Sequence, residues 1–115
     1  MLSFGSHLHV FLAAGVTDMR KSFNSLAGLV KNQLEGDPLS GHLFVFCNRR
    51  RDRIKVLVWD RGGYWVCAKR LEKGTFHWPE ADSKAIELTA AQLTLLLSGI
   101  DLQATRTRRW HDVER

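Results

Sequence analysis

The chain is poor in cysteine: Cys47 and Cys67 are its two cysteines, and they stand 20 residues apart. A disulfide framework or a four-ligand zinc site needs more cysteines at closer spacing. We therefore predict two reduced thiols, no metal site and no cofactor.

Long apolar runs are also missing. No stretch approaches the roughly 18 residues that a membrane span requires. The first ten residues lack the basic start and long apolar core of a secretory signal. We therefore expect a cytoplasmic protein with no membrane partner.

The familiar catalytic patterns are absent as well. Gly62-Gly63 does not precede a helix, so no phosphate-binding glycine loop is indicated. His7 and His9 share a strand face without a third ligand. Asp18, Asp52 and Asp60 could be drawn as a metal-dependent nuclease, but each also suits a cap, a turn or an ion pair. Nuclease activity is the third and weakest hypothesis, and we assign no catalytic residue.

What is present suffices for one globular domain. Of 115 residues 44% are hydrophobic and 25% charged, which fits a single packed core. We place this domain at residues 1–103. Residues 104–115 are polar and basic, and we predict a flexible tail.

Hydrophobic periodicity predicts an α+β fold. Steps of three and four indicate a helix at about 18–35, capped by Thr17 or Asp18, and a second at about 90–98 with a Thr89/Gln92 capping box. Strands are expected at 7–15, 41–48, 53–60, 64–71 and 75–78, with one more at 84–88. We predict a mostly antiparallel β-meander with both helices packed on one face.

Positive charge is concentrated in the middle of the chain. Between His42 and Pro79 nine Lys and Arg stand against three Asp and Glu, a net +6, whereas the remainder has eight against nine. The net charge of +5 therefore comes from this segment. Such asymmetry is typical of proteins that bind a polyanion, usually nucleic acid.

The centre of this charge is the connection between two predicted strands, Arg49 to Arg53. Arginine holds phosphate with a planar fork, and indole rings stack on bases. The candidate DNA-binding residues are Arg49, Arg50, Arg51, Arg53, Lys55, Arg61, Lys69, Arg70, Arg20 and Lys21. The candidates for base stacking or for anchoring a partner are Trp59, Trp65 and Trp110. A solvated hairpin tip and tryptophans packed in the core are the alternative interpretations.

Three segments resemble a known family: residues 13–30, 37–79 and 88–101, which include "TDMRKSF" and "FVFCNRRRDRIKVLVWD". They are similar to the accessory protein TnpB of IS66-type bacterial insertion sequences, which is unrelated to the RNA-guided nuclease of that name. The resemblance covers most of the chain. It departs from the family pattern at Val58 and at Val66 to Ala68, which affects strand packing and leaves the basic loop intact.

The resemblance implies a role in DNA transposition beside a separate transposase, with no catalytic residue to carry over. Our first hypothesis is a DNA-binding accessory factor, which would be associated with the nucleoid. The second is an adaptor that docks on the transposase through the same basic hairpin. Homo-oligomer formation, the preference for duplex DNA, single-stranded DNA or RNA, and sequence specificity stay open.

Overall fold

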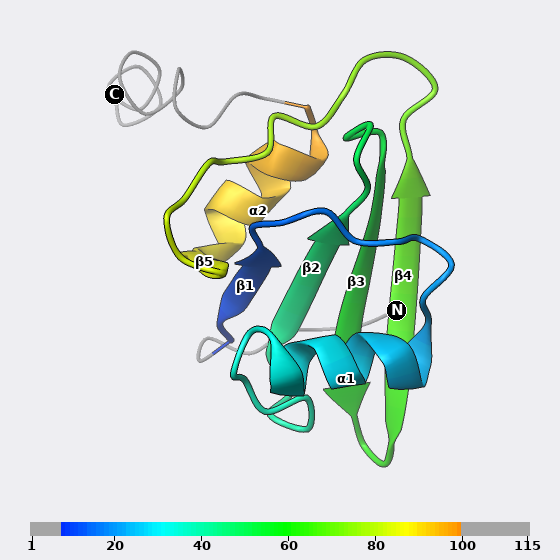
Figure 1. Ribbon diagram of the computed structural model, residues 1–115, viewed down its shortest axis with the longest axis vertical. Coiled ribbons are helices and arrows are strands. Elements are labelled where there is room, and N and C mark those ends of the chain that lie inside the picture. Colours follow the sequence, from blue (N-terminus) through cyan, green and yellow to red (C-terminus); the bar gives the residue numbers. More distant parts are fainter. Residues whose placement is uncertain (1–7, 100–115) are drawn as a thin grey trace.

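A computed structural model describes residues 8–99 as a five-stranded sheet with two helices (Figure 1). The strands are β1 (Val10–Ala13), β2 (Leu43–Cys47), β3 (Arg53–Asp60), β4 (Gly63–Arg70) and β5 (Ala85–Leu88). The helices are α1 (Phe23–Asn32) and α2 (Ala90–Leu97). The α+β prediction is confirmed. The tail at 104–115, with Trp110, lies outside the described residues.

The strand order is β4-β3-β2-β1-β5. β2, β3 and β4 form an antiparallel meander, β5 is antiparallel to β1, and the pair β1–β2 is parallel. A parallel pair needs a crossover, and α1 supplies it. No helix among residues 8–99 is long and apolar enough to cross a membrane.

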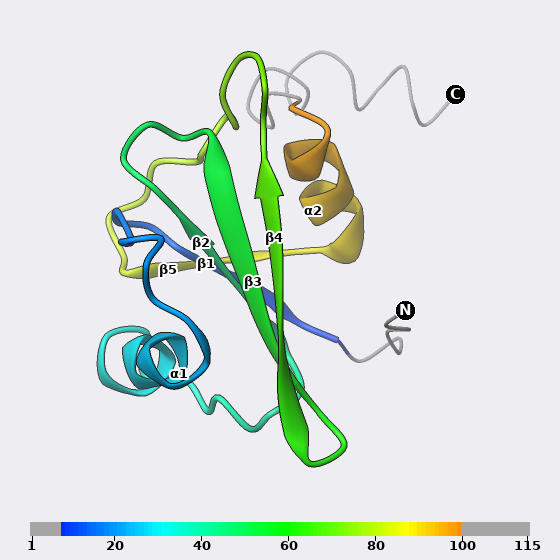
Figure 2. The same ribbon diagram turned by 90° about the vertical axis from the view of Figure 1, so that its right-hand side faces the viewer.

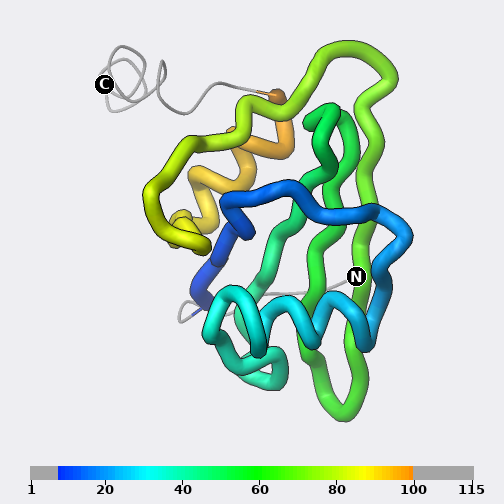
Figure 3. The backbone as a smooth tube through the Cα atoms, in the orientation of Figure 1, coloured from blue at the N-terminus to red at the C-terminus, as the bar shows by residue number. Residues whose placement is uncertain are grey.

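Residues 75–78, predicted as a fourth meander strand, form no strand. Phe76 is buried with the core on the α2 side, and its N–H donates to the Arg51 carbonyl at 2.6 Å. The Trp78 indole N–H donates to the Ala13 carbonyl at 3.0 Å. The two aromatic side chains therefore anchor this segment across the end of the sheet, and β4 is left as an edge strand. Figure 3 shows the segment returning from the end of β4 toward β5.

The helices cover opposite faces of the sheet (Figure 2), so the prediction of one shared face is wrong. Alternate residues of β2 pack in two hydrophobic cores, one on each face of the sheet. Leu43, Val45 and Cys47 pack on the α2 side, and Phe44 and Phe46 pack on the α1 side. The unbroken apolar run of β2 is the sequence signal for a strand buried on both faces.

The predicted helix at 18–35 is shorter at both ends. Asp18 does not cap it; instead its carboxylate accepts the Arg20 N–H at 2.9 Å in a turn, and Ser22 precedes the first helical residue. Beyond the helix, Glu35 takes a left-handed conformation with φ of 57°. The second helix agrees with its prediction, since Thr89 and Gln92 exchange hydrogen bonds at 3.1 and 2.9 Å.

Candidate nucleic-acid interface

The connection between β2 and β3 is a turn organised by one asparagine. The Asn48 side-chain oxygen accepts the N–H groups of Asp52 and Arg53, both at 3.1 Å. Its amide donates to the Asp52 carboxylate at 2.7 Å. This hydrogen bond, aided by nearby arginines, lowers the pKa of Asp52. The turn therefore engages its only carboxylate internally, through the Asn48 side chain.

Four arginines are exposed at this end of the sheet, and we call them the arginine end: Arg49, Arg50, Arg53 and Arg70. Arg53 and Arg70 are direct partners in the β3–β4 register, so their side chains leave the same face. Like charges in directly opposed positions destabilise a strand pair. The pairing therefore favours an anion from outside that would bridge the two guanidinium groups.

A shallow groove lies beside two of these arginines, Arg53 and Arg70. Its volume is about 520 Å³, and one carboxylate lies among the cations of its lining, which consists of Met19, Arg53, Ile54, Lys55, Ala68, Lys69, Arg70 and Glu72. Arg70 bonds Glu72 at 3.0 Å, whereas no ion pair among residues 8–99 involves Arg49, Arg50 or Arg53. Planar guanidinium groups at the wall of an open groove suit bidentate contact with a phosphate.

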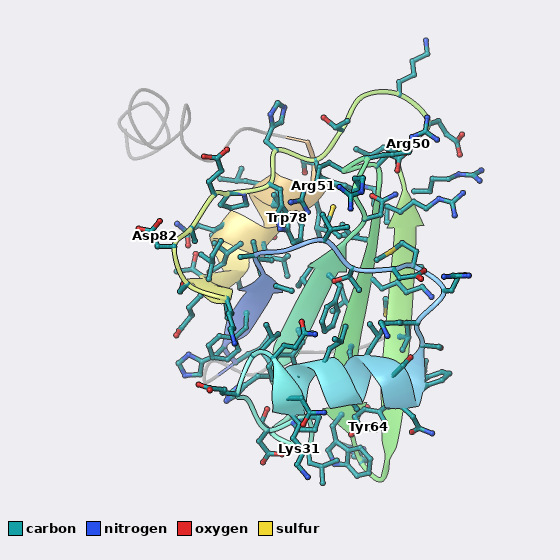
Figure 4. All side chains as sticks on the ribbon, viewed as in Figure 1. Lys31, Arg50, Arg51, Tyr64, Trp78 and Asp82 are labelled. Atoms are coloured by element: carbon teal, nitrogen blue, oxygen red, sulfur yellow. The ribbon has the colours of Figure 1, made fainter. Side chains whose placement is uncertain are left out.

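Arg51 differs from its neighbours because it turns inward. Its guanidinium lies 5.5 Å from the centre of the Trp78 ring, and one of its terminal nitrogens is buried without a partner. Figure 4 shows Arg51 beside Trp78, while Arg50 extends outward. Burial raises the pKa of the Cys47 thiol, and Arg51 partly offsets that rise. Arg51 thus joins the loop to the returning segment and is not part of the outer surface.

Replacing Arg51 with alanine should therefore lower stability and leave nucleic-acid binding unchanged. The loss of the cation–π contact and of the packed stem is worth about 1–2 kcal/mol. That corresponds to a fall of roughly 4–16 °C in the unfolding midpoint, measured by circular dichroism. Arg50→Ala, the same charge change on an exposed neighbour, is the control and should stay within about 0.5 kcal/mol. Equal midpoints for the two variants would contradict the structural role.

Two further candidate cations, Lys55 of β3 and Arg20 of the segment before α1, are already engaged. The Lys55 ammonium donates to the Lys21 carbonyl at 2.7 Å in a half-buried position. Arg20 makes a two-pronged contact with Asp18, at 2.6 Å for the closest pair of atoms. These contacts hold residues 18–21 against β3, and they leave Lys55 and Arg20 less available to bind an external anion.

The Asp18 pair predicts a specific pH response. Hydrogen bonds from Arg20 lower the pKa of Asp18 from 3.8 to about 2. A carboxyl group whose folded pKa is depressed adds stability above its unfolded pKa, and that stability is lost as pH falls toward the folded value. Wild type should therefore unfold at a higher temperature than Asp18→Asn at pH 5, and the difference should shrink as pH falls below the unfolded pKa of 3.8 and be mostly lost at about pH 2. A constant difference across this range would contradict the assignment.

The remaining candidates do not share one surface. Lys69 and Trp65 lie on the α2 face, where Lys69 donates to the Leu97 carbonyl at 2.9 Å. Trp59 lies on the α1 face and packs edge-on against Tyr64, with ring centres 5.1 Å apart. Arg61 is eight residues from Arg53 along β3 and its turn, about 26 Å away. The arginine end is therefore the densest cluster of the predicted residues.

One residue was missed by the candidate set although it was counted in the charged segment. Lys73 is exposed just after Leu71, whose N–H donates to the Asp52 carbonyl at 2.8 Å. This bond places the turn after β4 beside the arginine loop. The sequence signal for Lys73 was only its place in the positively charged segment, because its proximity to the arginine loop depends on the strand register.

The carboxylates of the nuclease hypothesis are spread apart and engaged individually. Asp18 bonds Arg20, Asp52 bonds Asn48, and Asp60 accepts the Trp65 indole N–H at 3.2 Å. Across residues 8–99, no three His, Cys, Asp or Glu side chains gather into a group that could hold a metal ion. The described residues thus offer a charged surface and not a metal centre.

Comparison with known proteins agrees with the resemblance in the sequence. A family model described as "IS66 Orf2 like protein" matches residues 8–107. The uncharacterized proteins y4hO and y4jC of Sinorhizobium fredii are similar to the chain. They are 46% and 34% identical, over 88% and 89% of this chain and 88% and 86% of their own lengths. No solved structure matches.

Proposed function

Because the chain belongs to the IS66 Orf2-like family of insertion-sequence proteins, we propose that it is a DNA-binding accessory factor of transposition. In this proposal it performs no bond cleavage itself. Its arginine end holds the DNA backbone, and the separate transposase carries out the chemistry.

The cross-strand pair Arg53–Arg70 is the observation that carries this proposal. The two guanidinium groups start from directly opposed positions beside an open groove, and although Arg70 also bonds Glu72, both can contact one bound phosphate there. Arg49, Arg50 and Lys73 extend the same end of the sheet and are exposed. Four or five cations on one compact end match the contacts of a backbone-binding surface, which positions a duplex without reading its sequence.

A second candidate, an adaptor for the transposase, is supported by Trp65. This side chain is 50% exposed on the α2 face, away from the arginine groove. Exposed tryptophan is enriched among the residues that anchor protein interfaces. The adaptor would use Trp65 as its apolar contact and the arginines as flanking charges.

Two assays separate these functions. A mobility-shift titration with a duplex from the element end tests DNA binding directly, and no shift at any protein concentration would overturn the first proposal. A pull-down with purified transposase after nuclease treatment tests the adaptor. Association that survives removal of DNA and is lost in Trp65→Ala would favour the adaptor; association lost with the DNA would favour DNA binding.

A further inference from the structure

The β4 strand forms a long open edge of the sheet. It spans eight residues, Gly63–Arg70, whereas the other edge strand, β5, has four. In Figure 2 β4 stands in front of the other strands, and no described helix or strand covers it. An uncovered edge of this length offers a row of backbone groups for pairing with another strand.

The β3–β4 turn determines which backbone groups face outward. Arg61 and Gly62 both have positive φ, 45° and 87°, and they form a two-residue turn closed by Asp60 and Gly63. In an antiparallel ladder, hydrogen-bonded pairs alternate with non-bonded pairs. Bonding to β3 therefore uses the odd-numbered residues of β4. The N–H and C=O groups that face outward belong to Tyr64, Val66, Ala68 and Arg70.

The side chains along this edge are arranged asymmetrically. Tyr64 and Trp65 stand at its beginning, Lys69 and Arg70 stand at its end, and small or aliphatic residues lie between. An antiparallel partner with the same sequence would bring the aromatic end of each copy against the basic end of the other. The strand is thus complementary to itself.

We propose that two copies of this chain pair through β4 in an antiparallel arrangement centred on Cys67. The outward groups of Tyr64 and Val66 then bond those of the partner's Arg70 and the partner's Ala68. Cys67 faces its own counterpart in a non-hydrogen-bonded pair. Lys69 and Arg70 each stand opposite an aromatic residue of the other copy, so in the dimer a cation–π contact can replace the bonds that they make within one copy to the Leu97 carbonyl and to Glu72.

The neighbouring registers lack this match. Because the outward residues are the even-numbered ones, the pairing can shift only in steps that keep even residues opposite even residues. One such shift places Lys69 opposite the partner's Gly63, and the shift in the other direction places it opposite the partner's Cys67. Neither opposes a cation to an aromatic ring, so the Cys67-centred register is favoured.

This dimer would align two arginine ends. Paired residues on adjacent strands project to the same side, so the α1 faces of both copies look the same way. Arg70 and the partner's Arg70 are offset by six residues, about 20 Å along the strands. The dimer would thus carry two phosphate-binding clusters on one side of a continuous ten-stranded sheet. The pairing itself does not depend on DNA binding.

Oxidative cross-linking at the native Cys67 tests the dimer and its register. In a non-hydrogen-bonded pair the Cα atoms lie about 4.5 Å apart, within the range for a disulfide. We expect the full chain, treated with copper-phenanthroline, to form a linked dimer of twice its 13.1 kDa mass. Cys67→Ser should abolish the link, since Cys47 is buried. In that background Lys69→Cys, about 13 Å from its counterpart, should not link.

Sedimentation provides the measurement without a covalent link. Cys67→Ser should remain a dimer, and Ala68→Pro should be a folded monomer, because the proline removes only an outward N–H. A wild-type monomer at all concentrations, or a Lys69→Cys link as fast as that of Cys67, would overturn the proposal. If Ala68→Pro fails to fold, the cross-linking comparison still decides the result.

Discussion

Replacing Arg50, Arg53 and Arg70 together with alanine should weaken binding to duplex DNA by roughly 500-fold at 0.1 M salt. Each phosphate contact releases condensed counterions and contributes about 0.9 to the log–log salt slope. The wild-type log K rises as salt falls from about 1 M to 0.1 M. The loss of three contacts removes about 2.7 logarithmic units from that rise. Fluorescence anisotropy with a labelled element-end duplex measures the change.

A matched control removes equal charge elsewhere. Lys31, Arg61 and Lys84 are exposed and lie outside the arginine end. The triple alanine variant at these positions has the same net charge as the test variant, so it retains any effect of overall charge. We expect it to bind within a few-fold of wild type. Equal loss in both triple variants would mean that net charge, and not the arginine end, determines binding.

Phe76→Ala should lower the free energy of unfolding by about 3–5 kcal/mol. Phe76 is 2% exposed and packs with the core on the α2 side, while its N–H holds the Arg51 carbonyl. Truncation leaves a cavity at the point where the arginine loop and the returning segment meet. Urea denaturation followed by tryptophan fluorescence provides the measurement.

The comparison for this variant is Phe23→Ala, the same deletion at a side chain that is 48% exposed on α1. It should cost less than about 1 kcal/mol, because little apolar area leaves the core. If the two phenylalanines cost the same, Phe76 does not anchor the segment after β4. In that case the orientation assigned to Arg51 would also lose its support.

Local patterns in the sequence predicted the elements that depend on neighbours in the chain. The strand at Arg53–Asp60 and the Thr89 capping box agree with prediction, because alternation and side-chain capping are local effects. The segment at 75–78 was predicted as a strand since it is aromatic and ends at a proline. Its conformation depends on burial of Phe76, a tertiary contact that overrides local preference.

The candidate site was predicted in part for the same reason. The alternation of residues within β3 and β4 predicted which residues share a face of each strand. Only the register between the two strands determines which face of β3 continues which face of β4. The two-residue turn at Arg61 and Gly62 aligns Arg53 with Arg70, and it places Trp59 and Trp65 on opposite faces. The inward turn of Arg51 depends on Trp78, 27 positions later in the chain. No local pattern could have distinguished Arg51 from Arg50.

The salt dependence of DNA affinity tests the central claim most directly. With four or five phosphates held by the arginine end, log K against log salt should fall with a slope of roughly −3.6 to −4.5. The Arg50, Arg53 and Arg70 triple variant should reduce that slope by about 2.7, whereas the Lys31, Arg61 and Lys84 variant should preserve it. A slope near zero for wild type, or the same slope for all three proteins, would contradict a phosphate-binding arginine end.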